Sequence, residues 1–273
     1  METVSDLIPG SSFRLLTRKN FYGDIMIGFL QSLDWSPLII TFKTGVVVTA
    51  ISFFVGLFAA AKLMRARRGI GAAIDGLLTL PMVIPPTVVG FFLLFLFSLR
   101  RPLGSFLYES FDIKLVQTWA GCVIAAFIIS FPLMYKNARA AFEQVDTDLI
   151  DAAMTLGLSD TKIFWRIIVP AARPGIISGT ILTFARSIGE YGATSMFAGN
   201  IAGKTGTIAQ AIAYVIKDGD YTKAGFWVFI VVLISFGVIF IVNIVIAKNY
   251  ARTWRREKIK RIIVRNAAPA PEL

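Results

Sequence analysis

Five stretches of the sequence are apolar over a length that can cross a lipid bilayer. They cover residues 44–61, 76–99, 115–135, 175–200 and 224–247, and only the fourth contains charged side chains. About 20 helical residues span the roughly 30 Å of bilayer hydrocarbon. Backbone groups in lipid must hydrogen-bond within the segment, which favours helices over open strands. The sequence therefore predicts an all-α membrane protein with five transmembrane helices.

The positive charges of the chain indicate an orientation in the membrane. The formal net charge is +11, which by itself would suit a nucleic-acid partner. In so apolar a chain, basic loops are better explained by retention on the cytoplasmic side. Five Lys and Arg residues lie in 136–173, four in 62–68 and eight in 248–265. We therefore expect a cytoplasmic C-terminus, an outer N-terminus and no nucleic-acid partner.

The five spans and the loops between them form one membrane domain, residues 37–247. Residues 1–36 form an N-terminal segment, in which residues 21–33 suit an amphipathic elbow helix at the membrane interface rather than a sixth span. Residues 248–273 form a basic cytoplasmic tail. The sequence contains one cysteine, no histidine and no pattern of metal ligands, so we expect no metal and no cofactor in this chain.

Three prolines interrupt the second apolar stretch. Pro81, Pro85 and Pro86 remove three backbone N–H donors within six residues, which bends or breaks a helix. Breaks of this kind in membrane helices often line a cavity, where polar neighbours satisfy the freed carbonyls. A kink used only for helix packing is an equally good explanation, and the sequence leaves both open.

The polar loop between the third and fourth spans, residues 137–173, predicts two short helices. Residues 148–156 carry apolar side chains at helical spacing, and Gly157 suits the left-handed turn that ends a helix. Ser159 suits the cap of a second helix, which Pro170 is expected to end. We expect a compact helix pair that projects from the membrane into a groove on a partner.

The loop resembles the EAA loop of bacterial ABC-importer permeases. That motif is Glu-Ala-Ala, three residues, Gly, nine residues, and Ile-x-Leu-Pro; here Asp151 and Val169 are the two departures. The resemblance implies that the loop docks on a cytoplasmic ATPase. Its coupling residues would be Asp151, Ala152, Ala153, Gly157, Phe164, Ile167 and Pro170.

Three further stretches are similar to the molybdate-type permeases of the oxyanion group. They are residues 80–90, LPMVIPPTVVG; residues 142–151, FEQVDTDLID; and residues 184–200, FARSIGEYGATSMFAGN. The resemblance implies a type I importer permease fold, a second copy of the chain, a cytoplasmic ATPase dimer and an external oxyanion-binding protein. It also implies a place in the bacterial inner membrane and transport of molybdate, with tungstate as a second cargo. The sequence has no GxxxxGK[ST] loop, so ATP and magnesium are expected in the partner ATPase and no catalysis in this chain.

The fourth span carries polar residues at intervals of three and four, which form one stripe on a helix. Charged groups inside a span usually face the bundle interior or water, and Arg186 precedes Glu190 by four residues, so the two can pair. We favour a structural role for this pair over an anion-attracting one. The hydroxyls of the stripe, with one from the second span, are candidate pathway residues: Thr87, Thr180, Thr183, Ser187 and Thr194.

Two other functions fit part of the sequence. A sulfate or thiosulfate permease of the same group presents a similar pore to a similar dianion. An ion-coupled secondary transporter or channel needs no ATPase, but it leaves the spacing of the loop motif unexplained, and we find no internal repeat that supports it.

Overall fold

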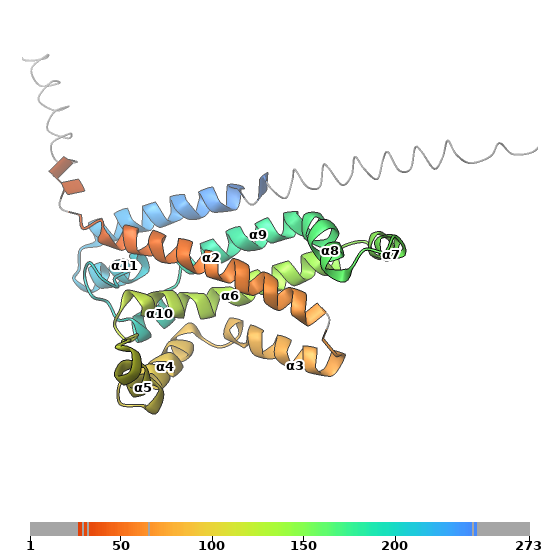
Figure 1. Cartoon of the computed structure of the whole chain (residues 1–273). Coiled ribbons are helices and arrows are strands. Elements are labelled where there is room, and N and C mark those ends of the chain that lie inside the picture. Colours follow the sequence, from red (N-terminus) through yellow and green to blue (C-terminus); the bar gives the residue numbers. More distant parts are fainter. Residues whose placement is uncertain (1–26, 29, 32, 65, 242, 245–273) are drawn as a thin grey trace, which may run out of the picture. The chain divides into compact units, whose positions relative to one another are not determined.

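The chain divides into two units, Met1–Ser36 and Pro37–Leu273. In the first, the Asp34 carboxylate accepts hydrogen bonds from the Ser36 N–H at 2.9 Å and the Ser36 hydroxyl at 2.7 Å. Most of the expected elbow, residues 21–33, and all of the basic tail, residues 248–273, lie outside the described residues. The computed structural model describes residues 27–28, 30–31, 33–64, 66–241 and 243–244 (Figure 1).

Regular structure in the described part of the second unit is entirely helical. A helix over Tyr221–Ile241 follows the numbered elements. The elements are α2 (Ser36–Met64), α3 (Arg68–Thr79), η1 (Leu80–Met82), α4 (Pro86–Phe97), α5 (Pro102–Phe111), α6 (Trp119–Glu143), α7 (Thr147–Thr155), α8 (Asp160–Ile163), η2 (Phe164–Ile168), α9 (Val169–Ile188), α10 (Gly192–Phe197) and α11 (Ile208–Lys217).

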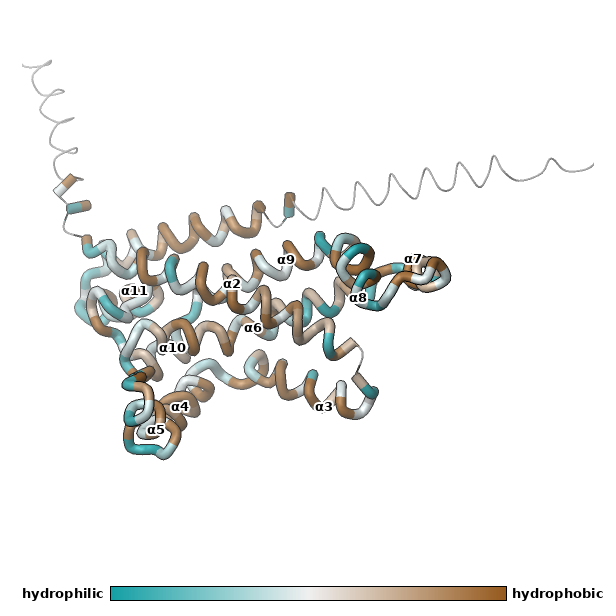
Figure 2. The backbone as a smooth tube through the Cα atoms, in the orientation of Figure 1, coloured by the Kyte–Doolittle hydropathy of each residue, from teal (hydrophilic) through white to brown (hydrophobic). Residues whose placement is uncertain are grey.

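The expected all-α membrane fold is confirmed. Within the described part of the chain, four helices are long and apolar enough to cross a membrane: Ser36–Met64, Trp119–Glu143, Asp160–Ile188 and Tyr221–Ile241. A bent pair, Gly69–Met82 with Pro86–Phe97, makes a fifth span if its two arms count as one. Figure 2 shows apolar residues along these helices and polar residues gathered at their ends and breaks.

The second span is broken, as its prolines predict. The helix direction bends by 104° between its two arms. Pro81 lies in the short 3₁₀ turn η1, Pro85 is the N-cap of α4 with φ −52° and ψ 134°, and Pro86 is the first residue of α4. A residue before proline is pushed out of the helical region, so the Pro85-Pro86 pair forces extended backbone between the two arms.

The predicted bounds of the fourth span, 175–200, are wrong at both ends. Pro170 does not end a helix. A five-residue π turn, η2, connects α8 directly to α9, so that Pro170 lies in the first turn of α9, where proline is tolerated. The helix that contains the span therefore begins at Asp160. It also ends early, at Ile188, since Gly189 caps α9 and a separate short helix, α10, begins at Gly192.

The third span is shifted toward the C-terminus relative to the predicted 115–135. α6 begins at Trp119, because the Thr118 hydroxyl caps it by accepting the Gly121 N–H at 3.2 Å. It continues through charged residues to Glu143, so the start of the predicted 137–173 loop belongs to the helix.

α6 is the central helix of the bundle and packs along α9 (Figure 1). Two glycines of α9 make this approach possible. A Cβ at Gly175 would lie 2.5 Å from the Ala141 Cβ, and one at Gly179 would lie 2.7 Å from the Asn137 Cβ. Between α2 and α6, a Cβ at Gly56 of α2 would lie 2.8 Å from the Met134 Cγ. Small residues therefore set the spacing of the bundle, as in many membrane proteins.

Candidate functional site

The predicted pair of short helices is present, and we call residues 147–163, α7 and α8, the hairpin. Asp146 caps α7 by accepting the Asp148 N–H at 3.0 Å. The Gly157 N–H donates to the Met154 carbonyl at 2.9 Å, and the Leu158 N–H donates to the Ala153 carbonyl at 3.1 Å. These two bonds define a Schellman turn, which requires the left-handed φ of +76° found at Gly157.

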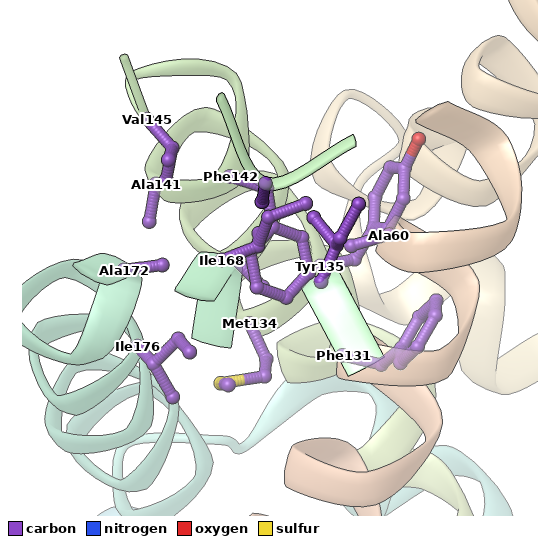
Figure 3. Packing of buried hydrophobic residues seen from close by; sticks show 13 residues of the cluster. Ala60, Phe131, Met134, Tyr135, Ala141, Phe142, Val145, Ile168, Ala172 and Ile176 are labelled. Carbon is purple, nitrogen blue, oxygen red and sulfur yellow. The ribbon is translucent and has the colours of Figure 1, made fainter. Parts of the chain in front are cut away.

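One side of the hairpin is anchored in the bundle. Ala153 and Ile163 are buried in the same apolar cluster as Phe142 and Tyr135 of α6. The Phe142 and Phe164 rings meet edge to face, with centroids 5.4 Å apart. Figure 3 shows the labelled members of this cluster between α6, α9 and the end of α2. The hairpin is thus fixed to the helices that cross the membrane.

The other side of the hairpin exposes apolar side chains. Leu156 is 81% exposed, and Leu149 and Met154 are 53% exposed each; Trp165, in the adjoining η2, is 61% exposed. A soluble surface rarely presents so many large apolar side chains together, and such patches mark interaction sites. The end of the bundle that carries α7 lies opposite the end that carries α11 (Figure 1).

The predicted coupling residues divide between these two sides. Asp151, Ala152 and Gly157 are exposed on the outer side, and Ala153 is buried against the bundle. Three later residues of the motif are half-buried, and two of them pack against the apolar cluster: Phe164, Ile167 and Pro170.

Two stretches about 100 residues apart in the sequence meet where α4 crosses α10. A Cβ at Gly90 would lie 2.8 Å from both the Cα and the carbonyl oxygen of Ala193. A Cβ at Gly192 would lie 3.0 Å from the Pro86 Cβ. The double-proline stretch and the Gly-Glu-Tyr-Gly stretch therefore form one close contact.

Glu190 holds the bend between α9 and α10. Its side chain is 2% exposed; Oε1 accepts the Ala193 N–H at 2.7 Å, and Oε2 pairs with the Arg186 Nη1 at 3.1 Å. A carboxylate that accepts an N–H at the start of a helix is favourable there. Arg186 and Glu190 do pair, but Glu190 lies beyond the end of α9 rather than on the same helix.

The candidate pathway hydroxyls do not form one continuous stripe, since α9 ends before Glu190. Thr183, Ser187 and Thr194 are buried within the single chain, and each donates to a carbonyl of its own segment, at 2.7, 2.8 and 3.0 Å. Thr180 is half-buried and donates to the Ile176 carbonyl at 2.8 Å. Thr87 is exposed, at the first turn of α4.

Sequence reasoning missed Asp75 of α3. Its carboxylate accepts hydrogen bonds from the Tyr135 hydroxyl, the Lys136 Nζ and the Arg139 Nη1, each at 2.7 Å. A signal was present, because an acidic residue beside a membrane span is costly and usually has a partner. Its three partners on α6 are not recognisable from spacing along the chain.

Comparison with known proteins identifies the family. Residues 52–256 match the model of the binding-protein-dependent transport system inner membrane component. The chain is 38% identical over 209 residues to the putative molybdenum transport system permease protein YvgM of Bacillus subtilis (strain 168), covering 77% of this chain and 92% of that protein. It is 41% identical over 188 residues to the molybdenum transport system permease protein ModB of Escherichia coli (strain K12), covering 69% and 82%.

Sulfate permeases are also similar, at lower identity. The probable sulfate transport system permease protein cysT of Chlorokybus atmophyticus is 34% identical over 218 residues, covering 78% of this chain and 74% of that protein. Among solved structures, a chain of the MetNI methionine ABC transporter in an inward-facing conformation matches with a TM-score of 0.57 at 18% identity. That match covers 77% of this chain and 94% of the other, and it confirms the type I ABC importer permease fold. The chain therefore belongs to the family of binding-protein-dependent transport system inner membrane components.

Proposed function

We propose that this chain is the membrane-spanning subunit of an ATP-driven importer of molybdate. Molybdate is supported as the substrate by the 38–41% identity to two molybdenum permeases, compared with 34% identity to a sulfate permease. The ion-coupled alternative of another class does not explain the family match or the hairpin. Tungstate has the same shape and charge as molybdate, so we propose it as a second cargo.

The hairpin is the proposed docking site for a cytoplasmic ATPase. Its buried side fixes it to α6 and α9, and its exposed side presents Leu156 and Met154, with Trp165 exposed on the adjoining η2. An apolar helix that projects from a bundle fits the groove-binding mode of recognition, in which a few large side chains anchor the helix. A movement of the ATPase would then reach the membrane helices through rigid packing.

We propose that ATP and magnesium bind to the partner and not to this chain. One segment, residues 198–205, approaches the GxxxxGK[ST] pattern, with Ala198 at the first glycine. It follows the helix α10 rather than a strand. The N–H groups of Lys204, Thr205 and Gly206 donate to the Ile201 carbonyl at 3.0, 2.9 and 3.2 Å, so they are not free to hold a phosphate.

The translocation route requires a second copy of the chain in this proposal. α4 and the helix Tyr221–Ile241 expose large apolar side chains, which suits contact with lipid or with another permease. The basic loops support a cytoplasmic hairpin and C-terminus and an outer N-terminus. An external binding protein would deliver the anion to the outer end, and Thr87, Thr180, Thr183, Ser187 and Thr194 remain the proposed pathway residues.

Uptake into liposomes tests this function directly. The assembled complex, with its ATPase and the oxyanion-binding protein, would be reconstituted with ATP inside and molybdate, tungstate or sulfate outside. We expect ATP-dependent accumulation of molybdate and tungstate, with little competition from sulfate. Accumulation of sulfate alone would support the alternative function, a sulfate permease. Accumulation without ATP would support an ion-coupled transporter.

A further inference from the structure

The attachment of α3 to the rest of the bundle is concentrated on one side chain. Among the described residues, every side-chain hydrogen bond that joins α3 to another helix ends at the Asp75 carboxylate. The apolar side chains of α3 are largely turned outward: Leu77 is 68% exposed and Ile70 59%. Leu78 packs partly against the apolar cluster.

The three donors to Asp75 are held in place by α6 itself. Tyr135 is fully buried, and its ring stacks on Phe131 with an interplanar angle of 17°. Arg139 is fixed from its other side, because its Nε donates to the Glu143 Oε1 at 2.7 Å and its Nη1 to the Tyr135 hydroxyl at 3.1 Å. The donors form a preorganised site, and such a network fixes a carboxylate more firmly than an isolated surface ion pair.

The same part of α6 leads directly into the hairpin. α6 ends at Glu143 and α7 begins at Thr147, with only three residues between them. Tyr135 shares its buried cluster with Ala153 of α7 and Ile163 of α8. A displacement of the hairpin therefore carries the donors to Asp75 with it.

On the far side of Asp75 the chain reaches the break in the second span. α3 continues through η1 into α4 across the 104° bend. Prolines in the break prevent the two arms from acting as one stiff helix, so a pull on α3 changes the bend rather than sliding the whole span. α4 in turn rests on α10, close to Glu190 and Thr194.

We propose that Asp75 is a positioning residue that transmits movement of the hairpin to the broken span α3–η1–α4. It acts as the mechanical link between the ATPase docking side and the α4–α10 contact. This inference rests on the proposed function, because it assumes that a partner ATPase moves the hairpin.

The test compares two carboxylates of the same network. Asp75→Asn removes the charge that α3 presents to α6. Glu143→Gln removes the other carboxylate bound to Arg139, but it leaves every bond between α3 and α6 in place. Both variants would be assembled into the full complex in liposomes, and molybdate transported would be measured per ATP hydrolysed.

We expect Asp75→Asn to keep ATP hydrolysis while the molybdate transported per ATP falls by about tenfold, the value of a lost charge-assisted hydrogen bond in a two-state equilibrium. The same ratio in Glu143→Gln should stay within about twofold of the unaltered complex, since its carboxylate is half exposed. An unchanged ratio in Asp75→Asn, or an equal fall in both variants, would overturn the proposal.

A second variant serves if Asp75→Asn fails to assemble. The Lys136 side chain is 44% exposed and lies outside the apolar cluster, so Lys136→Gln should fold normally. It removes one of the three donors, and we expect a fall in the transport ratio of about threefold. A normal ratio would overturn the proposal. If the unaltered complex transports no molybdate, the proposed function fails instead, which separates the two outcomes.

Discussion

The two ends of the path from hairpin to broken span are built differently. The hairpin end, α7 and α8 with the adjoining parts of α6 and α9, rests on a buried cluster of aromatic and aliphatic side chains. The broken span, α3–η1–α4, exposes most of its apolar residues, and the described side-chain hydrogen bonds from its first arm to α6 all end at the Asp75 carboxylate. The hairpin end is therefore closely packed, whereas the broken span has a bend between two loosely packed arms.

This difference suggests a division of labour. A packed end transmits force without deforming, because close-packed interiors are poorly compressible. A span broken by prolines changes its bend at low cost, since the prolines have already removed backbone hydrogen bonds that would resist bending. Substitutions at the packed end should therefore act on stability, while substitutions along the broken span should act on transport.

The largest effect on stability is expected at the α6–α9 contact. Gly175→Ala places a methyl group where the Ala141 Cβ already lies 2.5 Å away. We expect a loss of about 3 kcal/mol, at the upper end of the cost of overpacking, measured by thermal unfolding in detergent. Gly237→Ala is the matched control, because a Cβ there meets nothing within 4 Å. Equal unfolding midpoints in the two variants would refute the packed-end description.

A smaller loss is expected at the bend that supports the broken span. Glu190→Gln keeps an acceptor for the Ala193 N–H but leaves Arg186 without its partner, at a cost of about 2 kcal/mol. Glu143→Gln offers the matched exposed pair, also four residues apart, and should cost less than about 0.5 kcal/mol.

Anion selectivity separates the two roles of Glu190. If the pair is structural, Glu190→Gln lowers the unfolding midpoint and the yield of complex, while the preference for molybdate over sulfate is retained. Normal assembly with altered anion preference would instead assign the pair to the translocation route.

The turn of the hairpin should show a modest, local effect. Gly157→Ala forces a left-handed φ of +76° on a residue with a Cβ, at a cost of about 1 kcal/mol. Gly157→Asn should cost less, because asparagine tolerates this region. Hydrogen exchange at α7 would report the change, and faster exchange in the alanine variant only is the expected pattern. Equal exchange in both variants would contradict the Schellman assignment.

Hydropathy was sufficient to predict the membrane fold, and proline positions were sufficient to predict the break in the second span. Both signals are local. The ends of the fourth span were not predictable, because an apolar average does not detect the cap at Gly189 or the π turn before Pro170.

The candidate site was also predicted only where its features depend on local sequence. Gly157 and the two short helices follow from local turn chemistry, and the structure contains them. Asp75 and its three partners are separated by 60 residues or more, so only tertiary packing brings them together. The contact of Gly90 with Ala193 is of the same kind.

The central claim is that the exposed side of the hairpin binds a partner and contributes nothing to the fold. Leu156→Ser tests it most directly, because this side chain is 81% exposed on α7's C-cap. The measurement is the amount of ATPase that remains bound to the purified variant, alongside its thermal unfolding; Phe106→Ser, 57% exposed on α5, is the control. We expect an unchanged unfolding midpoint for Leu156→Ser and about tenfold less bound ATPase, as for a binding hot spot. Normal binding of the ATPase by a folded Leu156→Ser variant would contradict the account.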